Sequence, residues 1–337
     1  MCRGLSVPIP HDRMNEVSGR YASELNWEDA MKKLLAAAAT IAMVAAATPV
    51  LATDIIVVAH GQANDPFWSV VKNGAEKAAK DTGVNVEFRA PETFDMVAMG
   101  QMIDAAVNQD PDGLVVSIPD ADALGPAIKR AVEAGIPVIS MNSGSDVAHK
   151  LGAKLHVGQS EFDAGKVAGQ KLAEMGGKKA ICVNQEVGNV SLDQRCAGFT
   201  EGFGKEVKVL PTSNDPTEVE SKVRAALESD KDVNVVLSLN ASLVGEPAVK
   251  AAEALGRDDV LISTFDLSAG FLKYVADGKA AFSIDQQQYL QGYLPISFLA
   301  LNAQYGLMPG GDVPSGPNLV TKETAAQVID LSAKGIR

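Results

Sequence analysis

The chain has 337 residues, of which 46% are hydrophobic and 21% are charged, with 30 Gly and 16 Pro. These values are ordinary for a globular protein and exclude collagen-like, low-complexity and largely disordered chains, and the length suggests two domains. The formal net charge of -12 argues against a nucleic-acid partner, which would need a basic face, and three cysteines are too few for a disulfide-rich scaffold.

Residues 31–52 have the pattern of a bacterial secretory signal peptide. Two lysines follow the methionine that opens this stretch, an Ala-rich apolar run comes next, and small residues precede a cleavage site after Ala52. Residues 1–30 lack apolar periodicity, and we interpret them as an upstream start-site artefact. The alternative is an uncleaved membrane anchor, because Leu34–Ala52 is just long enough to span a bilayer. The cleavage-like end favours a signal peptide, so residues 53–337 are predicted to be exported to the periplasm.

Short apolar runs alternate with amphipathic segments through the first half of the exported part. Asp54–His60 is nearly all apolar, which is typical of a parallel strand buried on both faces. Pro66–Lys80 places its apolar residues on one helical face. The pattern continues with predicted strands at 84–89, 113–117 and 136–141 and predicted helices at 96–108 and 121–134. This repetition of strand, helix and strand predicts a doubly wound parallel sheet with right-handed crossovers.

The same alternation restarts in the second half. It predicts helices at 162–175, 191–203, 216–228, 241–255, 269–276 and 290–305 and strands at 179–184, 207–210, 233–239, 260–265 and 280–285. The expected fold class is therefore α/β, with two doubly wound, Rossmann-like parallel-sheet lobes. Open sheets of this kind bind ligands beyond the carboxyl ends of their strands, so two facing lobes would share one cleft.

Polar and aromatic side chains gather where these predicted strands end. Carboxylates and amides form paired hydrogen bonds with hydroxyl groups, and an aromatic face packs against the C–H groups of a ring. The pattern therefore favours a neutral polyhydroxylated ligand. The alternative at each single position is a helix N-cap or a turn, for which the same residue types are preferred. The candidate ligand residues are Asp65, Phe67, Trp68, Asn142, Asp193, Asn240, Asp266 and Gln286.

Motifs for catalysis, cofactor binding and metal binding are absent from the sequence. There is no His-Glu-x-x-His or Cys-x-x-Cys run, no P-loop, no Gly-x-Gly-x-x-Gly after the first strand and no Gly-x-Ser-x-Gly elbow. His60 ends the first strand and is a candidate base, although a hydrogen-bonding or packing role fits it better. The sequence therefore predicts a protein that is not an enzyme and has no cofactor or metal.

Two cysteines remain in the exported part of the chain. Cys182 lies in a predicted strand and Cys196 in the following predicted helix, so the two side chains have an opportunity to meet. Export to an oxidising compartment favours a disulfide between them. Two buried free thiols are the alternative.

Several motifs in order along the exported chain resemble the ribose-type periplasmic sugar-binding proteins, which are the extracytoplasmic receptors of ABC importers. The motifs are Asn64-Asp-Pro-Phe-Trp68, Asp112-Gly-Leu-Val-Val-Ser117, Gly135-Ile-Pro-Val-Ile-Ser140, Thr264-Phe-Asp266 and Ile284-Asp-Gln-Gln-Gln-Tyr-Leu-Gln-Gly292. The resemblance implies the type I periplasmic binding protein fold, in which three hinge strands join the lobes. The crossings are expected near 157–159, 286–288 and 316–318. The implied domains are 53–158 with 288–315 for the N-terminal lobe, and 159–287 with 316–337 for the C-terminal lobe.

The resemblance also carries the candidate residues over one by one. Asp65, Phe67 and Trp68 match the first ligand loop of the family, and Asn240, Asp266 and Gln286 match its other polar ligand positions. Asn142 falls where ribose-binding members carry Asp, and the next residue is Ser143 in place of an Arg. Asp193 falls where those members carry a second Arg, although Arg195 is nearby.

Loss of both arginines favours a neutral sugar or polyol over ribose itself and over anionic ligands. The implied partner is an ABC transporter membrane permease, with a chemoreceptor as a further candidate, and the implied state is a monomer. A signalling receptor and a secreted sugar-modifying enzyme are the rival functions. A repressor core of the same fold is disfavoured by the signal peptide.

Overall fold

The computed structural model describes residues 28, 31–32, 53–61 and 65–337. The predicted upstream segment (1–30) and signal peptide (31–52) lie outside this part of the chain, apart from three isolated positions. Within the described residues, none of the helices combines the length and the apolar character that a membrane crossing requires.

The first sheet has six strands, all of them parallel to their neighbours. Its order is β11 (Val313–Pro314), β5 (His156–Gly158), β4 (Val138–Asn142), β3 (Gly113–Val116), β1 (Asp54–Val58) and β2 (Asn85–Arg89). The helical elements of this lobe are α2 (Pro66–Thr82), α3 (Met96–Val107), α4 (Ala121–Glu133), the short η1 (His149–Leu151) and α10 (Gln288–Tyr305). We call this group the first lobe.

The second sheet also has six strands, and β12 alone among its described strands runs antiparallel to its neighbour. Its order is β12 (Asn318–Val320), β10 (Phe282–Asp285), β9 (Leu261–Phe265), β8 (Val235–Ser238), β6 (Ala180–Asn184) and β7 (Val207–Pro211). The helical elements of the second lobe are α5 (Glu161–Glu174), α6 (Val190–Phe203), α7 (Pro216–Ser229), the π-helical η2 (Ala241–Gly245), α8 (Glu246–Ala254), α9 (Ala269–Asp277) and α11 (Lys322–Ala333).

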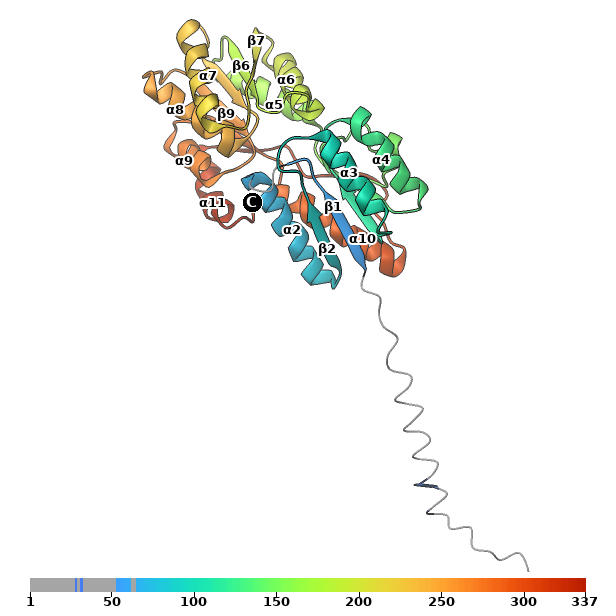
Figure 1. The fold of residues 1–337 in the computed structure, drawn as a ribbon. Coiled ribbons are helices and arrows are strands. Elements are labelled where there is room, and N and C mark those ends of the chain that lie inside the picture. The colour runs from blue at the N-terminus through green and yellow to red at the C-terminus, as the bar shows by residue number, and fades with distance from the viewer. Residues whose placement is uncertain (1–27, 29–30, 33–52, 62–64) are drawn as a thin grey trace, which may run out of the picture. The chain divides into compact units, whose positions relative to one another are not determined.

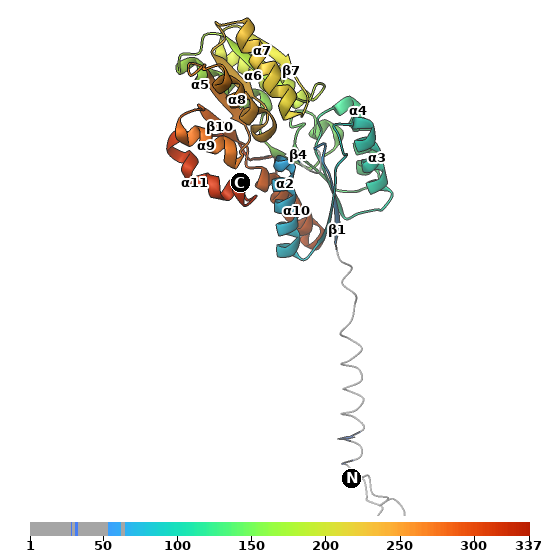
Figure 2. The same ribbon diagram turned by 60° about the vertical axis from the view of Figure 1, so that its left-hand side comes forward.

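The chain passes between the two sheets three times: between β5 and α5, between β10 and α10, and between β11 and β12. Figures 1 and 2 show the resulting groups, with α3 and α4 in one lobe and α7 and α8 in the other. The predicted fold class, two doubly wound α/β lobes, is confirmed.

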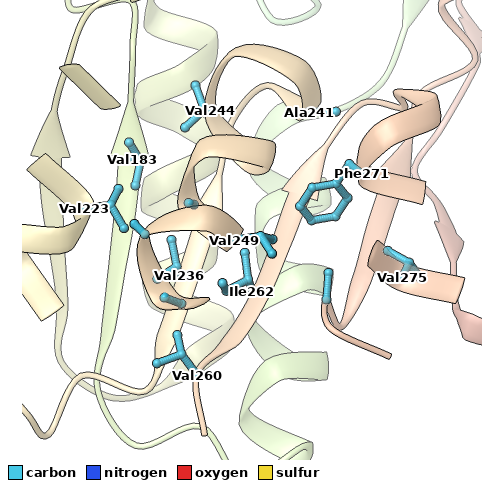
Figure 3. Packing of buried hydrophobic residues seen from close by; sticks show 14 of the residues in the cluster. Val183, Val223, Val236, Ala241, Val244, Val249, Val260, Ile262, Phe271 and Val275 are labelled. Atoms are coloured by element: carbon cyan, nitrogen blue, oxygen red, sulfur yellow. The ribbon is translucent and has the colours of Figure 1, made fainter. Parts of the chain in front are cut away.

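Each sheet is covered by helices on both faces, so its central strands are nearly all buried. Figure 3 shows one of the resulting cores, in which Val236 and Ile262 of the second sheet pack near Val249 of α8 and Phe271 of α9. Helices that lie side by side on one face come very close. A Cβ atom at Gly292 of α10 would lie 1.9 Å from the carbonyl oxygen of Val71 in α2. Only glycine permits that contact, which keeps α10 on the first lobe.

The structure differs from the sequence expectations at short or irregular elements. The predicted helix 241–255 opens with the π-helical turn η2 before α8 begins. The alternation pattern does not predict the strands β5, β11 and β12 or the helix α11, although the family resemblance implies hinge strands near 157–159 and 316–318. Strands of two or three residues are too short to show a period, which explains why pattern reasoning misses them.

Candidate functional site

Side chains from both lobes meet beyond the carboxyl ends of the strands and enclose a small hollow, here called the interlobe pocket. It is lined by His60, Asp65, Phe67, Trp68, Asn142, Ser143, Gln185, Glu186, Asn189, Ser191, Leu192, Arg195, Leu239, Asn240, Asp266 and Gln286. The space that protein atoms leave free is about 340 Å³, part of it open to solvent. Concave places where a few polar side chains converge are the usual small-molecule sites of proteins, so the pocket is the candidate ligand site.

Seven of the eight candidate residues line this pocket: Asp65, Phe67, Trp68, Asn142, Asn240, Asp266 and Gln286. They come from the start of α2 and from the ends of four strands in two sheets. The strand-end pattern therefore identified side chains that meet in space. Their contact with a ligand stays a prediction.

Asp193 is the candidate that the fold does not bring to the pocket. It is exposed, and its carboxylate accepts a hydrogen bond from the Asn184 amide at 2.9 Å. Two residues along a helix are rotated by roughly 200°, so Asp193 and Arg195 point in nearly opposite directions. Arg195 is the one that lines the pocket. The pocket therefore keeps an arginine that the resemblance suggested was lost.

The remaining lining residues give different sequence signals. His60, Ser143, Gln185 and Glu186 directly follow strands and carry the same signal as the residues that were selected. Arg195 lies inside a helix, where a charged side chain is normally expected to be exposed to solvent. Its side chain is nevertheless buried, with only 4% exposed. A buried arginine of this kind is visible only in the folded structure.

Capping and pocket lining are combined in the same side chains. The Asp65 carboxylate caps α2 by accepting the Phe67 amide at 2.9 Å. The Asn240 side chain caps η2 by accepting the Leu243 amide at 2.9 Å. One of the two Asp65 oxygens and the single side-chain oxygen of Asn240 are thus used by the fold, which leaves the other Asp65 oxygen and the Asn240 NH2 group. The helix starts hold both side chains in a fixed orientation at the pocket.

Aromatic rings form one wall of the pocket. Trp68 packs edge-on against His60, with 4.8 Å between ring centroids, and against Phe67 at 5.1 Å. A Cβ atom at Gly61 would lie 1.5 Å from the Trp68 indole nitrogen, so the ring lies directly over that backbone. Trp68 is 4% exposed and also belongs to the core of the first lobe. The two roles weighed for this residue, core packing and pocket lining, therefore coexist.

Amide groups connect the lobes across the floor of the pocket. The Asn142 amide donates to Gln286 Oε1 at 3.1 Å, and Gln286 Nε2 donates to Asp266 Oδ1 at 2.5 Å. Asn142 and Asp266 have positive φ values of 61° and 70°. Such backbone costs free energy in residues other than glycine and is concentrated at functional sites.

Burial dominates the titration of the pocket carboxyls. It raises the pKa of Asp266 to about 7 and that of Asp65 to about 6, and it also raises the pKa of Glu186. Burial, together with the positive charge of Arg195, lowers the pKa of His60 to about 3. His60 is therefore neutral at physiological pH, and its Nδ1 lies 2.8 Å from the Ser117 hydroxyl. The pocket therefore contains a neutral imidazole and carboxyl groups whose negative charge is disfavoured by burial.

The positive charge in the pocket is already paired. Arg195 forms a two-pronged ion pair with Glu161 at 2.6 and 3.0 Å, and both side chains are buried. Its guanidinium also lies 4.3 Å from the centroid of the Phe265 ring. Because Glu161 lies behind it, Arg195 has little capacity left to balance an anionic ligand.

Two hydrogen bonds join the lobes at residues that neighbour the pocket-lining residues of α6 in the chain. The Val190 amide of the second lobe donates to the Pro119 carbonyl of the first at 3.0 Å. The Gln194 side chain donates to Asp146 Oδ2 at 3.3 Å. The structure is therefore a closed arrangement in which the lobes touch beside the pocket, while part of the pocket stays open to solvent.

Cys182 of β6 and Cys196 of α6 form a disulfide in the structure. It joins the strand beside the pocket to the helix that carries Arg195.

A larger hollow lies at the opposite end of the second sheet, near the starts of β9 and β10. It is lined by side chains such as Lys171, Glu253, Arg257 and Lys279, and it contains none of the candidate residues. In the described part of the chain, no cluster of three or more His, Cys, Asp or Glu side chains is placed to hold a metal ion. The convergence of buried polar groups favours the interlobe pocket as the functional site.

Comparisons with known proteins match most of the chain. A sequence model of the family described as "Periplasmic binding protein domain" matches residues 55–306. The ribose import binding protein of Salmonella typhimurium is 28% identical over 263 residues, which cover 76% of this chain and 87% of that protein. The xylose/arabinose-binding protein of Sulfolobus acidocaldarius is 25% identical over 260 residues, which cover 72% of this chain and 64% of that protein.

Solved structures show the same relationship. The carbohydrate transporter from Acidothermus cellulolyticus in complex with myo-inositol has a TM-score of 0.80 and 34% identity, covering 85% of this chain and all of that one. A solute binding protein from Actinobacillus succinogenes with bound D-allose has a TM-score of 0.71 at 22% identity, covering 81% of this chain and 99% of that one.

Proposed function

We propose that this chain, which belongs to the periplasmic binding protein family, captures a neutral polyhydroxylated ring between its lobes and delivers it to the membrane permease of an ABC importer. Relatives named as import binding proteins and a carbohydrate transporter support this role. The chain acts as an exported, periplasmic monomer whose predicted signal peptide is 31–52, and it is not an enzyme.

The observation that carries the proposal is the excess of acidic over basic side chains in the interlobe pocket. Asp65, Asp266 and Glu186 contribute carboxyl groups, whereas Arg195 is paired with Glu161. An ionised carboxyl accepts hydrogen bonds and a protonated one also donates, and a ligand hydroxyl both donates and accepts, so hydroxyls pair with these groups in either state. A ligand with many hydroxyls satisfies these groups, whereas an anionic ligand adds charge repulsion.

Because of this charge balance, we propose a cyclitol as the first candidate ligand and a pentose or hexose as the second. An inositol, the fully hydroxylated cyclitol, carries a hydroxyl on every ring carbon and has no ring oxygen that needs a donor. The structural relative that is 34% identical was solved with myo-inositol. Curated relatives are named for ribose, xylose and arabinose, which is why a sugar is the second choice.

The mechanism is hinge closure. A ligand that contacts Asp65 of the first lobe and Asp266 of the second stabilises only the arrangement in which both are close. Binding then shifts an open ensemble to the closed form that the permease recognises. In this scheme, residues 53–158 with 288–315 move against residues 159–287 with 316–337.

A calorimetric and thermal-shift screen tests the proposal, using myo-inositol, D-ribose and D-allose, with D-glucuronate as the anionic control. A neutral ligand at 100 times its Kd adds about 2.7 kcal/mol to the free energy of unfolding. We expect myo-inositol to bind most tightly and D-glucuronate to give no heat. Tighter binding of D-glucuronate than of every neutral compound, or no binding of any neutral compound, would contradict the proposal.

A further inference from the structure

The residues after α11 return to the hinge and contact a buried carboxylate there. Arg337 Nε donates to Asp285 Oδ2 at 2.8 Å, and Asp285 is 0% exposed. The other oxygen of Asp285 accepts the Gln287 amide at 2.8 Å. Arg337 is therefore the cation that balances a buried charge at the end of β10.

Asp285 is directly joined to a pocket residue. Gln286 follows it in the chain and bridges Asn142 and Asp266. Gln287 has a positive φ of 52°, a conformation that needs support in a residue other than glycine. The Asp285 carboxylate provides that support by accepting the Gln287 amide. This hydrogen bond connects the residue before Gln286 to the residue after it.

The same segment also contacts the first lobe. The Asn73 side chain of α2 donates to the Gly335 carbonyl at 3.0 Å. Gly335 has a φ of 63°, a left-handed conformation that favours glycine, and a Cβ atom there would lie 2.5 Å from Asn73 Nδ2. Figures 1 and 2 both show the C-terminus beside α11 and near α2. Residues 335–337 thus lie between a helix of the first lobe and a hinge strand of the second.

We propose that residues 335–337, here called the strap, position Gln286 for the ligand through the Arg337–Asp285 ion pair and stabilise closure through the Asn73–Gly335 contact. Arg337 is a positioning residue that acts from outside the pocket. This inference rests on the proposed function, since it assigns the strap a role in ligand binding.

A purely structural role would fasten α11 to its lobe without affecting the pocket. The two roles differ in what they change. If the strap only stabilises the packing of α11, loss of the Arg337–Asp285 ion pair lowers the melting temperature and leaves Kd unchanged in the folded protein. Loss of a positioning residue raises Kd and loosens the backbone around Gln286 even where the protein is fully folded.

The test uses Arg337→Ala, Asp285→Asn, their double variant and Asn73→Ala in the full chain. Arg130→Ala is the matched control, because it removes an exposed arginine paired with Asp104 at 2.7 Å, remote from the hinge. Calorimetry with myo-inositol gives Kd, thermal melting gives stability, and amide hydrogen exchange of the ligand-free protein reports on the Gln287 amide.

We expect Arg337→Ala to raise Kd at least about fivefold, the low end of typical coupling between sites, and to accelerate exchange at Gln287. The double variant is expected to bind better than the two single changes predict by addition, because it removes the uncompensated charge. Asn73→Ala is expected to raise Kd with little change in melting temperature, and Arg130→Ala to leave Kd unchanged.

An Arg337→Ala protein with wild-type Kd and wild-type exchange at Gln287 would overturn the proposal, even if its melting temperature fell. If the wild-type protein binds no neutral compound, the proposed function fails on that result. The exchange at Gln287 then decides separately whether the strap holds the hinge.

Discussion

Asp266 combines a buried carboxyl group with an unfavourable backbone conformation. Its carboxyl is buried, its backbone has a positive φ, and it accepts the Gln286 amide. The hydrogen bond from Gln286 is favourable, but burial of the carboxyl and the strained backbone both cost free energy. A residue kept under such conditions is expected to serve the ligand.

Asp266→Asn is predicted to weaken ligand binding strongly while the protein remains folded. The amide preserves the shape of the side chain but loses a charged acceptor, which contributes about 1.5–3 kcal/mol to a buried hydrogen bond. Calorimetry with the ligand found in the screen measures the effect. Asp193→Asn is the matched control, because Asp193 is exposed and outside the pocket, and its Kd should equal that of the wild type. Equal affinity of Asp266→Asn and the control would remove Asp266 from the site.

The same substitution is predicted to change how stability depends on pH. Burial raises the pKa of Asp266 from 3.8 to about 7, so between these values the folded state binds more protons than the unfolded state. The stability contributed by Asp266 is therefore present below about pH 4 and is lost as pH rises to about 7, by up to roughly 4 kcal/mol. The free energy of unfolding of Asp266→Asn, taken relative to that of the wild type, should therefore increase as pH rises from about 4 to 7.

Denaturant unfolding of the ligand-free protein at pH 5 and pH 8 measures this difference. The comparison with the variant is necessary because His60, whose pKa is lowered to about 3, gives the opposite slope below pH 6.5. A difference between wild type and variant that stays constant from pH 5 to pH 8 would contradict the assignment of a raised pKa to Asp266.

At the scale of elements, the disulfide between β6 and α6 is predicted to persist in the exported protein and to stabilise the second lobe. Closing a loop of this size stabilises a fold by about 3 kcal/mol in the chain-entropy model. Unfolding of the wild type with and without reductant measures the effect, and Cys182→Ser with Cys196→Ser serves as the unbridged reference. Two free thiols per chain under denaturing, non-reducing conditions would show that the bridge does not form.

The long elements could be predicted from the sequence because their periodicity is strong, and the pocket could be predicted because parallel strands bring their carboxyl ends together. Asp65, Asn142 and Asp266 were identified by this rule. The sequence could not show that Arg195, and not Asp193, lines the pocket, because this depends on how α6 is rotated about its own axis. The alternation pattern also misses the strands β11 and β12, since their pairing is decided by distant parts of the chain.

At the scale of the whole molecule, three chain crossings join the lobes covalently, and the proposed hinge closure would occur about them. The contacts between the lobes in the closed arrangement include polar ones outside the pocket, such as Val190–Pro119 and Gln194–Asp146. Contacts of this kind are weakly stabilising when exposed to water. The ligand is thus expected to supply much of the free energy that keeps the lobes together.

Trp68 is expected to report this closure directly. It is the sole tryptophan in residues 53–337, because the chain has two and the other is Trp27. In the closed arrangement it is 4% exposed and lies in the wall of the pocket. Opening the lobes would bring water to its ring, so ligand addition should change its emission intensity or wavelength and saturate at the Kd measured by calorimetry.

Trp68→Ala is predicted to weaken binding by a few kcal/mol, because a large aromatic contact in the centre of a desolvated site is lost. It also removes a side chain from the first core, so its melting temperature should fall as well. Trp68→Phe separates the two effects, since it keeps most of the apolar volume but presents a smaller face to the ligand. Near-wild-type melting with clearly weaker binding is expected for Trp68→Phe. An emission spectrum that stays fixed through saturation, together with wild-type affinity in Trp68→Phe and Trp68→Ala, would assign Trp68 to the core alone and leave the ligand to the polar wall.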